Sequence, residues 1–232
     1  MSSKLKYWYL HKHKLFKNLS YEEIDGLCIL KRFNKSKKNE IIQLPYSEKE
    51  RVYFLKKGTI KLISICEQGQ ETLINVLQKG DLFGDLNLER SEEVSNFFKV
   101  VSEEAIICTF LKERLENLTL KKPDFALKYI KFIGFRYKSI QNNYRNLLFK
   151  DAKSRLVLLL NMLIEKEEIT SSSYTLPNYL TQKDYAQLIC ASRQTIISLF
   201  KELEEEGFLN YSQKEISIPD ISKINKFIEN VK

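Results

Sequence analysis

The spacing of apolar residues changes along the chain, and the first change separates a helical N-terminal segment from a β-rich region. Residues 1–30 carry apolar side chains at helical spacing, with Ser20 as the expected N-cap. From Arg32 to about Phe110, short β-branched and aromatic runs alternate with glycine-containing turn signals. This spacing predicts a barrel or jelly roll. Strands are expected at 41–44, 52–55, 59–66, 72–77, 97–101 and 105–111.

Two helices are expected after the strands, a short one over 112–119 and a long one from Pro123 to about Phe149. One stripe of the long helix recurs at alternating steps of three and four residues, a heptad seam typical of a helix that pairs with its own copy. A second stripe would dock the helix on the barrel; the alternative is that both stripes are buried inside one subunit. The seam, which is the predicted dimer interface, comprises Ile130, Ile133, Tyr137, Ile140, Tyr144 and Leu147, and the docking stripe comprises Phe125, Tyr129, Phe132 and Phe135.

The C-terminal third predicts one more amphipathic helix and then two short helices joined by a tight turn. Asp151 is the expected N-cap of the first, which runs to about Glu168 and is followed by a polar loop over 169–179. Thr181 caps the next helix, and Asp184 reaches back as an acidic variant of the capping box. These spacings predict a helix-turn-helix; the alternative is an ordinary helical hairpin. Its second helix is capped by Ser192 and would bury Ile196, Leu199, Phe200 and Leu203.

The outer face of that second helix is polar at and near its N-terminus, where a recognition helix meets base edges in the major groove. Arginine suits guanine and glutamine suits adenine, so the face predicts sequence-specific contact with double-stranded DNA. Two capping hydroxyls are expected to contact phosphates, and an alternating hairpin over 208–218 would form a wing. The predicted DNA-binding residues are Thr181, Ser192, Arg193, Gln194, Thr195, Ser198 and Lys201.

The net charge of +8 suggests an anionic partner, but the charge is unevenly distributed. From Asp151 onward the chain has 10 Lys and Arg against 12 Asp and Glu, whereas residues 1–150 hold 28 against 18. The basic excess is concentrated between Lys121 and Lys150, with 8 basic residues and a single acid. These lysines would contact phosphates flanking the binding site, or they form an ordinary solvated surface.

Candidate chemistry other than DNA binding is sparse in the sequence. The four cysteines lie far apart without a CxxC pair, which argues against a zinc knuckle and a disulfide framework. His11 and His13 are expected to be a solvated pair; the alternative is that they contact a haem or a metal. We expect no metal, no cofactor and no enzymatic activity, because acid, base and nucleophile candidates are isolated from one another. Without an apolar span or a signal peptide, the protein is expected in the cytoplasm. Cys190, in the turn, is either a small buried filler or an oxidation-sensitive thiol.

Three stretches, residues 52–86, 150–163 and 181–209, resemble the cyclic-AMP receptor protein and fumarate-nitrate reduction regulator (Crp/Fnr) family of bacterial transcription factors. The resemblance implies an α+β chain with a cyclic-nucleotide-binding-type β-roll over 1–120, a dimerisation helix over 121–150 and a winged helix-turn-helix over 151–232. It also implies a homodimer on a palindromic operator, and RNA polymerase as a partner.

The same resemblance locates an effector pocket whose residues depart from the pattern of the nucleotide-binding members. Gly84-Asp85 stands for their Gly-Glu pair, whereas their phosphate-binding Arg-Ser falls near Ser95-Asn96, which supplies no guanidinium. Classical cyclic AMP sensing is therefore not expected, and the roll either senses an unidentified small molecule or is structural. The alternative is a cyclic-nucleotide-responsive regulator with a rebuilt loop containing Arg90. The predicted pocket residues are Gly84, Asp85, Leu86, Ser95, Asn96, Ile140 and Gln141.

Overall fold

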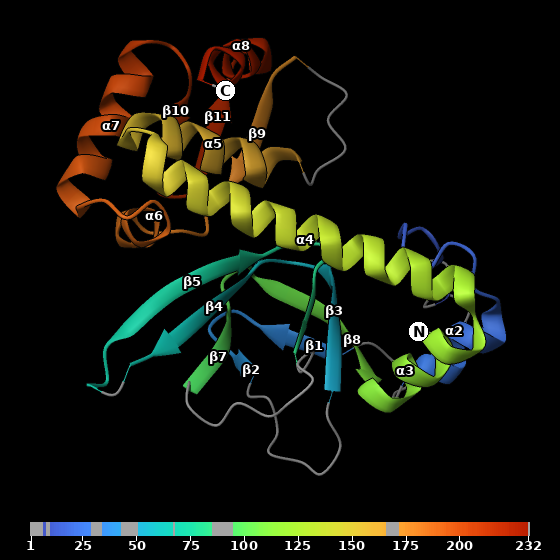
Figure 1. The fold of residues 1–232 in the computed structure, drawn as a ribbon. Coiled ribbons are helices and arrows are strands. Elements are labelled where there is room, and N and C mark those ends of the chain that lie inside the picture. Colours follow the sequence, from blue (N-terminus) through green and yellow to red (C-terminus); the bar gives the residue numbers. More distant parts are fainter. Residues whose placement is uncertain are drawn as a thin grey trace. The chain divides into compact units, whose positions relative to one another are not determined.

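The computed structural model describes residues 7, 10–28, 34–42, 51–66, 68–84, 95–165 and 172–231 (Figure 1). The chain forms two compact units, Met1–Ser139 and Ile140–Lys232. The division falls inside one continuous helix, α4 (Pro123–Phe149), which begins at its proline as expected. No helix in the described ranges is long and apolar enough to cross a lipid bilayer.

Two four-stranded antiparallel sheets form the first unit, in the strand orders β1-β8-β3-β6 and β2-β7-β4-β5. Their inner faces enclose a core in which the Phe83 ring contacts both Tyr53 and Phe98, with ring centroids 5.2 and 4.7 Å apart. The predicted β-roll and the α+β class are confirmed, although β1 and β6 were not anticipated. The strands are β1 (Asn34–Lys37), β2 (Ile41–Ile42), β3 (Arg51–Lys57), β4 (Ile60–Ile65), β5 (Glu71–Leu77), β6 (Leu82–Gly84), β7 (Ser95–Val100) and β8 (Glu104–Leu111).

A second core lies where the N-terminal segment, α3 (Lys112–Lys121) and the start of α4 pack on the roll. Helix α2 (Tyr21–Leu27) starts at the predicted cap: the Ser20 hydroxyl accepts from the Glu23 amide, and the Glu23 carboxylate accepts from the Ser20 amide. The first unit therefore has two hydrophobic cores, one between the sheets of the roll and one between the roll and the helices that cover it.

The docking stripe of α4 differs from the prediction at its last member. Phe125 is buried, and Tyr129 and Phe132 pack against the same core, but Phe135 is 72% exposed. The next residue takes its place: the Arg136 guanidinium lies 3.0 Å from the buried carboxylate of Asp81. The stripe therefore continues at steps of four, three and four residues, and it ends in an ion pair rather than in a ring.

The expectation of two solvated histidines is wrong for His13. Its imidazole is half-buried, with its centroid 5.0 Å from that of Phe54 and 5.9 Å from that of Phe132. Burial lowers the pKa of His13, against an opposing contribution from the Asp81 carboxylate. His13 is thus a packing residue of the second core.

The second unit is a helical domain with a three-stranded antiparallel sheet of order β10-β11-β9. Strand β9 (Tyr174–Pro177) corrects the prediction of a polar loop: Leu176 is buried and pairs with Ile216. Helix α8 (Ile221–Val231) was also not anticipated. The other elements are α5 (Ala152–Glu165), α6 (Gln182–Leu188), α7 (Arg193–Glu205), β10 (Asn210–Tyr211) and β11 (Glu215–Ile218).

Candidate nucleic-acid interface

Helices α6 and α7 form the predicted helix-turn-helix, and side chains cap both. The Thr181 hydroxyl accepts from the Asp184 amide at 3.2 Å, while Asp184 Oδ2 accepts from the Thr181 amide at 2.6 Å and from its hydroxyl at 2.7 Å. Ser192 Oγ accepts from the Thr195 amide at 3.0 Å. Both helix starts are therefore fixed by the cap residues that the sequence indicated.

The turn between the two helices depends on an unusual backbone conformation at Cys190. Its φ of 50° lies in the left-handed region, which side chains with a Cβ rarely adopt. The following amide, that of Ala191, donates to the Ala186 carbonyl at 2.9 Å and closes the turn. The Cys190 side chain is exposed, so the interpretation as a buried filler is wrong. A chain reversal at this point leaves the side chain no interior to enter.

The exposed side of α7 collects the polar residues that were predicted to contact DNA. Arg193, Gln194, Ser198 and Lys201 are exposed, while Thr195 is half-buried with its hydroxyl 2.8 Å from that of Ser192. The opposite side of the helix is fully packed, as the spacing predicted. Its buried residues are Ile196, Leu199, Phe200 and Leu203.

A buried polar network, which sequence reasoning missed, joins the wing to the helix-turn-helix through Asn178. The side-chain Nδ2 group of Asn178 donates to the Ser212 carbonyl at 2.8 Å, and its backbone amide donates to the Lys214 carbonyl, also at 2.8 Å. Asn178 Oδ1 accepts from the Tyr185 hydroxyl at 3.1 Å and from the Leu180 amide at 3.3 Å. Burial raises the pKa of Tyr185, which therefore keeps its proton for this bond. The Asn178 side chain thus joins the wing turn to α6 by hydrogen bonds.

We expect Asn178→Ala to lower the free energy of unfolding by about 1–3 kcal/mol, because it leaves the buried Tyr185 hydroxyl without its acceptor. Denaturant titration of the purified chain measures the loss. Adding Tyr185→Phe to the same chain removes the orphaned hydroxyl and is expected to recover part of it. An Asn178→Ala chain as stable as the wild type would show that the network contributes nothing.

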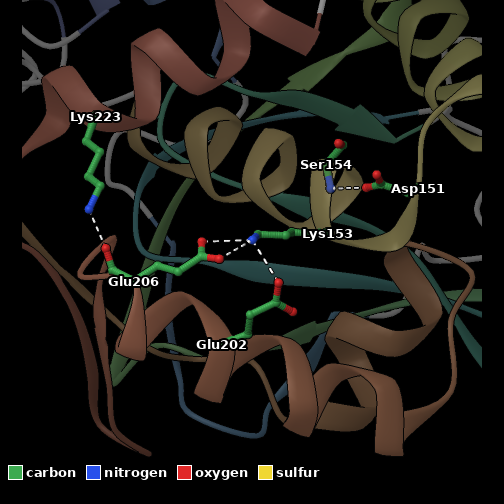
Figure 2. A network of polar contacts seen from close by, with 6 residues as sticks. All are labelled: Asp151, Lys153, Ser154, Glu202, Glu206 and Lys223. Carbon is green, nitrogen blue, oxygen red and sulfur yellow. Dashed lines mark hydrogen bonds and ion pairs between the residues drawn. The ribbon is translucent and has the colours of Figure 1, made fainter.

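The C-terminal end of α7 is held by a second polar network, drawn in Figure 2. Lys153 Nζ, from the first turn of α5, lies 2.8 Å from Glu202 Oε1 and 2.7 Å from Glu206 Oε1. Burial acts to lower the pKa of Lys153, but its bonds to these two carboxylates outweigh burial and raise it. Lys223 of α8 donates to the Glu206 carbonyl. Helix α7 is therefore tied to two neighbouring helices at the end opposite Arg193.

Figure 2 also shows how α5 begins, at Asp151 and Ser154. The Asp151 carboxylate accepts from the Ser154 amide at 2.7 Å, which lowers the pKa of Asp151. The predicted N-cap is therefore confirmed. Lys153 follows this cap by two residues. The ion pairs that it makes with Glu202 and Glu206, here called the Lys153 clamp, therefore begin within one helical turn of the end of α4.

The predicted dimer seam lies uncovered along α4 in the single chain. Five of its six members are exposed, and Leu147 is half-buried. A row of isoleucines and tyrosines of this length on water is unfavourable, since burying each such side chain is worth about 1.5–3 kcal/mol. The exposed fractions are 65% for Ile130, 39% for Ile133, 61% for Tyr137, 66% for Ile140 and 62% for Tyr144.

The structure places only part of the predicted effector pocket. Gly84 ends β6 with a φ of 111°, and a Cβ there would lie 2.5 Å from the Arg51 carbonyl oxygen, so glycine is required. Asp85 and Leu86, like Arg90, lie outside the described residues. Ser95 and Asn96 stand in β7 opposite Ile65 and Ser64 of β4. Ile140 and Gln141 lie on α4 in the second unit, so the pocket itself remains a prediction.

Two family profiles match the chain: the cyclic nucleotide-binding domain over residues 34–122 and the Crp-like helix-turn-helix domain over residues 154–227. Among curated relatives, the global nitrogen regulator of Synechocystis sp. is 26% identical over 192 residues, 82% of this chain and 84% of that protein. The CRP-like cAMP-activated global transcriptional regulator of Mycobacterium tuberculosis is 22% identical over 177 residues, 75% of this chain and 78% of that protein.

Solved structures share the fold. FixK2 of Bradyrhizobium japonicum matches with a TM-score of 0.69 at 15% identity, over 84% of this chain and 95% of that one. A CooA mutant of Carboxydothermus hydrogenoformans matches with a TM-score of 0.66 at 21% identity, over 93% of this chain and 94% of that one. With both domain profiles in the expected order and regulators as relatives, the chain belongs to the Crp/Fnr family of DNA-binding transcription regulators.

Proposed function

We propose that two copies of the chain pair along the α4 seam and set their α7 helices in successive major grooves of a palindromic operator. The observation that carries this proposal is the polar outer face of α7, fixed by two capped helices and a packed inner side. Once bound, the dimer would act on transcription through RNA polymerase. A two-fold dimer matches a palindrome because each half-site presents the same bases to the same helix.

The residues of α7 divide into base contacts and phosphate contacts in this proposal. Arg193 and Gln194, in the first turn, have the donor and acceptor geometry for guanine and adenine, and Ser198 follows Gln194 by one helical turn. Lys201 and the α7 N-terminus with Ser192 and Thr195 would contact phosphates. Thr181 would also contact a phosphate, but its hydroxyl donates to Asp184 and must exchange that bond to do so.

Selection of bound duplexes from random DNA tests the assignment. Against the selected operator, Arg193→Ala is expected to cost about 1–3 kcal/mol and to relax preference at one base pair per half-site. Lys201→Ala is expected to weaken all sequences evenly and to lower the salt dependence by about one ion per half-site. Equal losses on operator and random DNA for Arg193→Ala would refute the base-reading role.

We also propose that the effector, where there is one, is not cyclic AMP, although the mycobacterial relative is named as cAMP-activated. The proposal is supported by Ser95 and Asn96 in β7, near which the family resemblance places the Arg-Ser of the nucleotide-binding members, because neither side chain carries a guanidinium. A cyclic phosphate without a guanidinium loses its bidentate, charge-neutralising partner.

Calorimetry with cyclic AMP and cyclic GMP is therefore expected to give no micromolar binding and no gain in DNA affinity. A micromolar dissociation constant for either nucleotide would contradict the proposal. Arg90→Ala would then test the alternative of a rebuilt phosphate-binding loop, because loss of that affinity would identify Arg90 as the displaced ligand.

A further inference from the structure

One apolar side chain interrupts the polar face of α7. Ile197 is 36% exposed, and it is the only large hydrophobic residue classed as exposed among the described residues 151–165 and 172–231. It follows Arg193 by one helical turn and precedes Lys201 by one turn, so the three side chains form a row along the helix.

Ile197 lies outside the buried core of the domain. The inner side of α7 is already closed by four buried residues, each at most 8% exposed, and Ile197 lies outside that stripe. Leaving part of an isoleucine in water forgoes hydrophobic stabilisation that a polar residue would not forgo. An isoleucine between an arginine and a lysine on an exposed helix face therefore suggests an apolar ligand atom that covers it in the bound state.

Major-groove chemistry offers such an atom at one base only. Thymine presents its C5-methyl group there, whereas adenine, guanine and cytosine present donors, acceptors or a C5 hydrogen. We infer that Ile197 is a specificity-determining residue that packs on the methyl group of a thymine in each half-site. The inference rests on the proposed placement of α7 in the groove, and it adds a methyl-dependent preference for thymine that hydrogen bonds to its O4 atom do not give.

The test replaces thymine by uracil, which pairs identically and lacks only the methyl group. In the operator selected by the wild-type chain, each thymine is replaced in turn in both half-sites, and affinity is measured for wild type and Ile197→Ala. One position is expected to lose about fourfold affinity per half-site with the wild type, the value of one buried methyl-sized group. With Ile197→Ala, thymine and uracil at that position are expected to bind equally.

Two controls separate this effect from general weakening of the complex. Glu229→Ala, an exposed change on α8, should keep the uracil sensitivity of the wild type. Ile197→Leu, which stays apolar, should keep part of the uracil sensitivity. Ile197→Ala is expected to leave α7 folded, because alanine has a high helix propensity. A selected operator without a methyl-sensitive thymine, or equal uracil losses in wild type and Ile197→Ala, overturns the inference. If the wild type selects no sequence at all, the proposed function itself fails.

Discussion

A chain carrying Ile133→Glu and Ile140→Glu is expected to sediment as a monomer and to lose about 10²–10⁴-fold in operator affinity. Each substitution places like charges opposite one another across the two-fold axis, at positions 39% and 66% exposed in the single chain. A monomer engages one half-site at a time, so it loses the high effective concentration that the second half-site has within a dimer. Analytical ultracentrifugation and binding to the full operator measure both losses.

The matched control moves the same two charges off the seam. Phe135→Glu with Asn142→Glu introduces two exposed glutamates at the same spacing of seven residues elsewhere on α4, with the same change in net charge, and should leave the dimer intact. An unchanged dimer in the Ile133→Glu/Ile140→Glu chain would mean that α4 does not form the subunit contact.

Arg136→Ala is expected to lower the free energy of unfolding by about 3 kcal/mol, because it leaves the Asp81 carboxylate charged and largely desolvated. The Asp81 side chain is 6% exposed and lies 3.0 Å from the guanidinium. Asp81 also accepts from the Gln78 amide at 2.8 Å, which limits the loss without replacing a positive charge. Chemical denaturation followed by fluorescence measures the effect.

An exposed ion pair of the same unit is the control. Lys38 and Glu103 approach to 2.8 Å but are 50% and 80% exposed, so Lys38→Ala should cost less than about 1 kcal/mol. Asp81→Asn should cost less in the Arg136→Ala chain than in the wild type, since it removes the carboxylate charge that Arg136 balances in the wild type. Equal costs for Arg136→Ala and Lys38→Ala would show that burial of Asp81 is not what makes its pair strong.

The sequence predicts those parts of the fold that depend on local spacing. The caps Ser20, Asp151, Thr181 and Ser192 mark helix starts within a few residues, where one side chain decides the outcome. Strand β9 was missed because a short polar segment becomes a strand only by pairing with β11, about forty residues later.

Contacts between residues far apart in sequence were not predictable from local spacing. From the sequence, His13 is expected to be a solvated residue near the N-terminus, but in the structure Phe54 and Phe132 pack against it. The Sγ atoms of Cys28 and Cys108, which are 80 residues apart in sequence, lie 3.3 Å apart. Neither neighbourhood follows from a spacing rule, since both depend on how the N-terminal segment covers the roll.

In the candidate DNA-binding site, too, local features were predictable from the sequence and contacts between remote elements were not. The exposed face of α7 follows from helical periodicity, whereas the Asn178 network and the Lys153 clamp join elements that are remote in sequence. Asn178 had one available signal, a lone amide between apolar neighbours just before a helix cap. The base and phosphate contacts themselves stay predictions.

The C-terminal end of α7, where Glu202 and Glu206 pair with Lys153, is acidic. Its distance from Arg193 explains how a domain with more acidic than basic residues can approach DNA. Helix α7 has 13 residues and is about 20 Å long, whereas the screening length in 0.1 M salt is about 10 Å. Glu202 and Glu206 lie about 14 and 20 Å from Arg193 along the helix axis, so their field is largely screened there, and phosphates are expected to attract the Arg193 end of the helix more strongly than its glutamate-rich end. We expect this polarity to favour diffusional encounters in which the Arg193 end of the helix faces the DNA over those in which the glutamate end does.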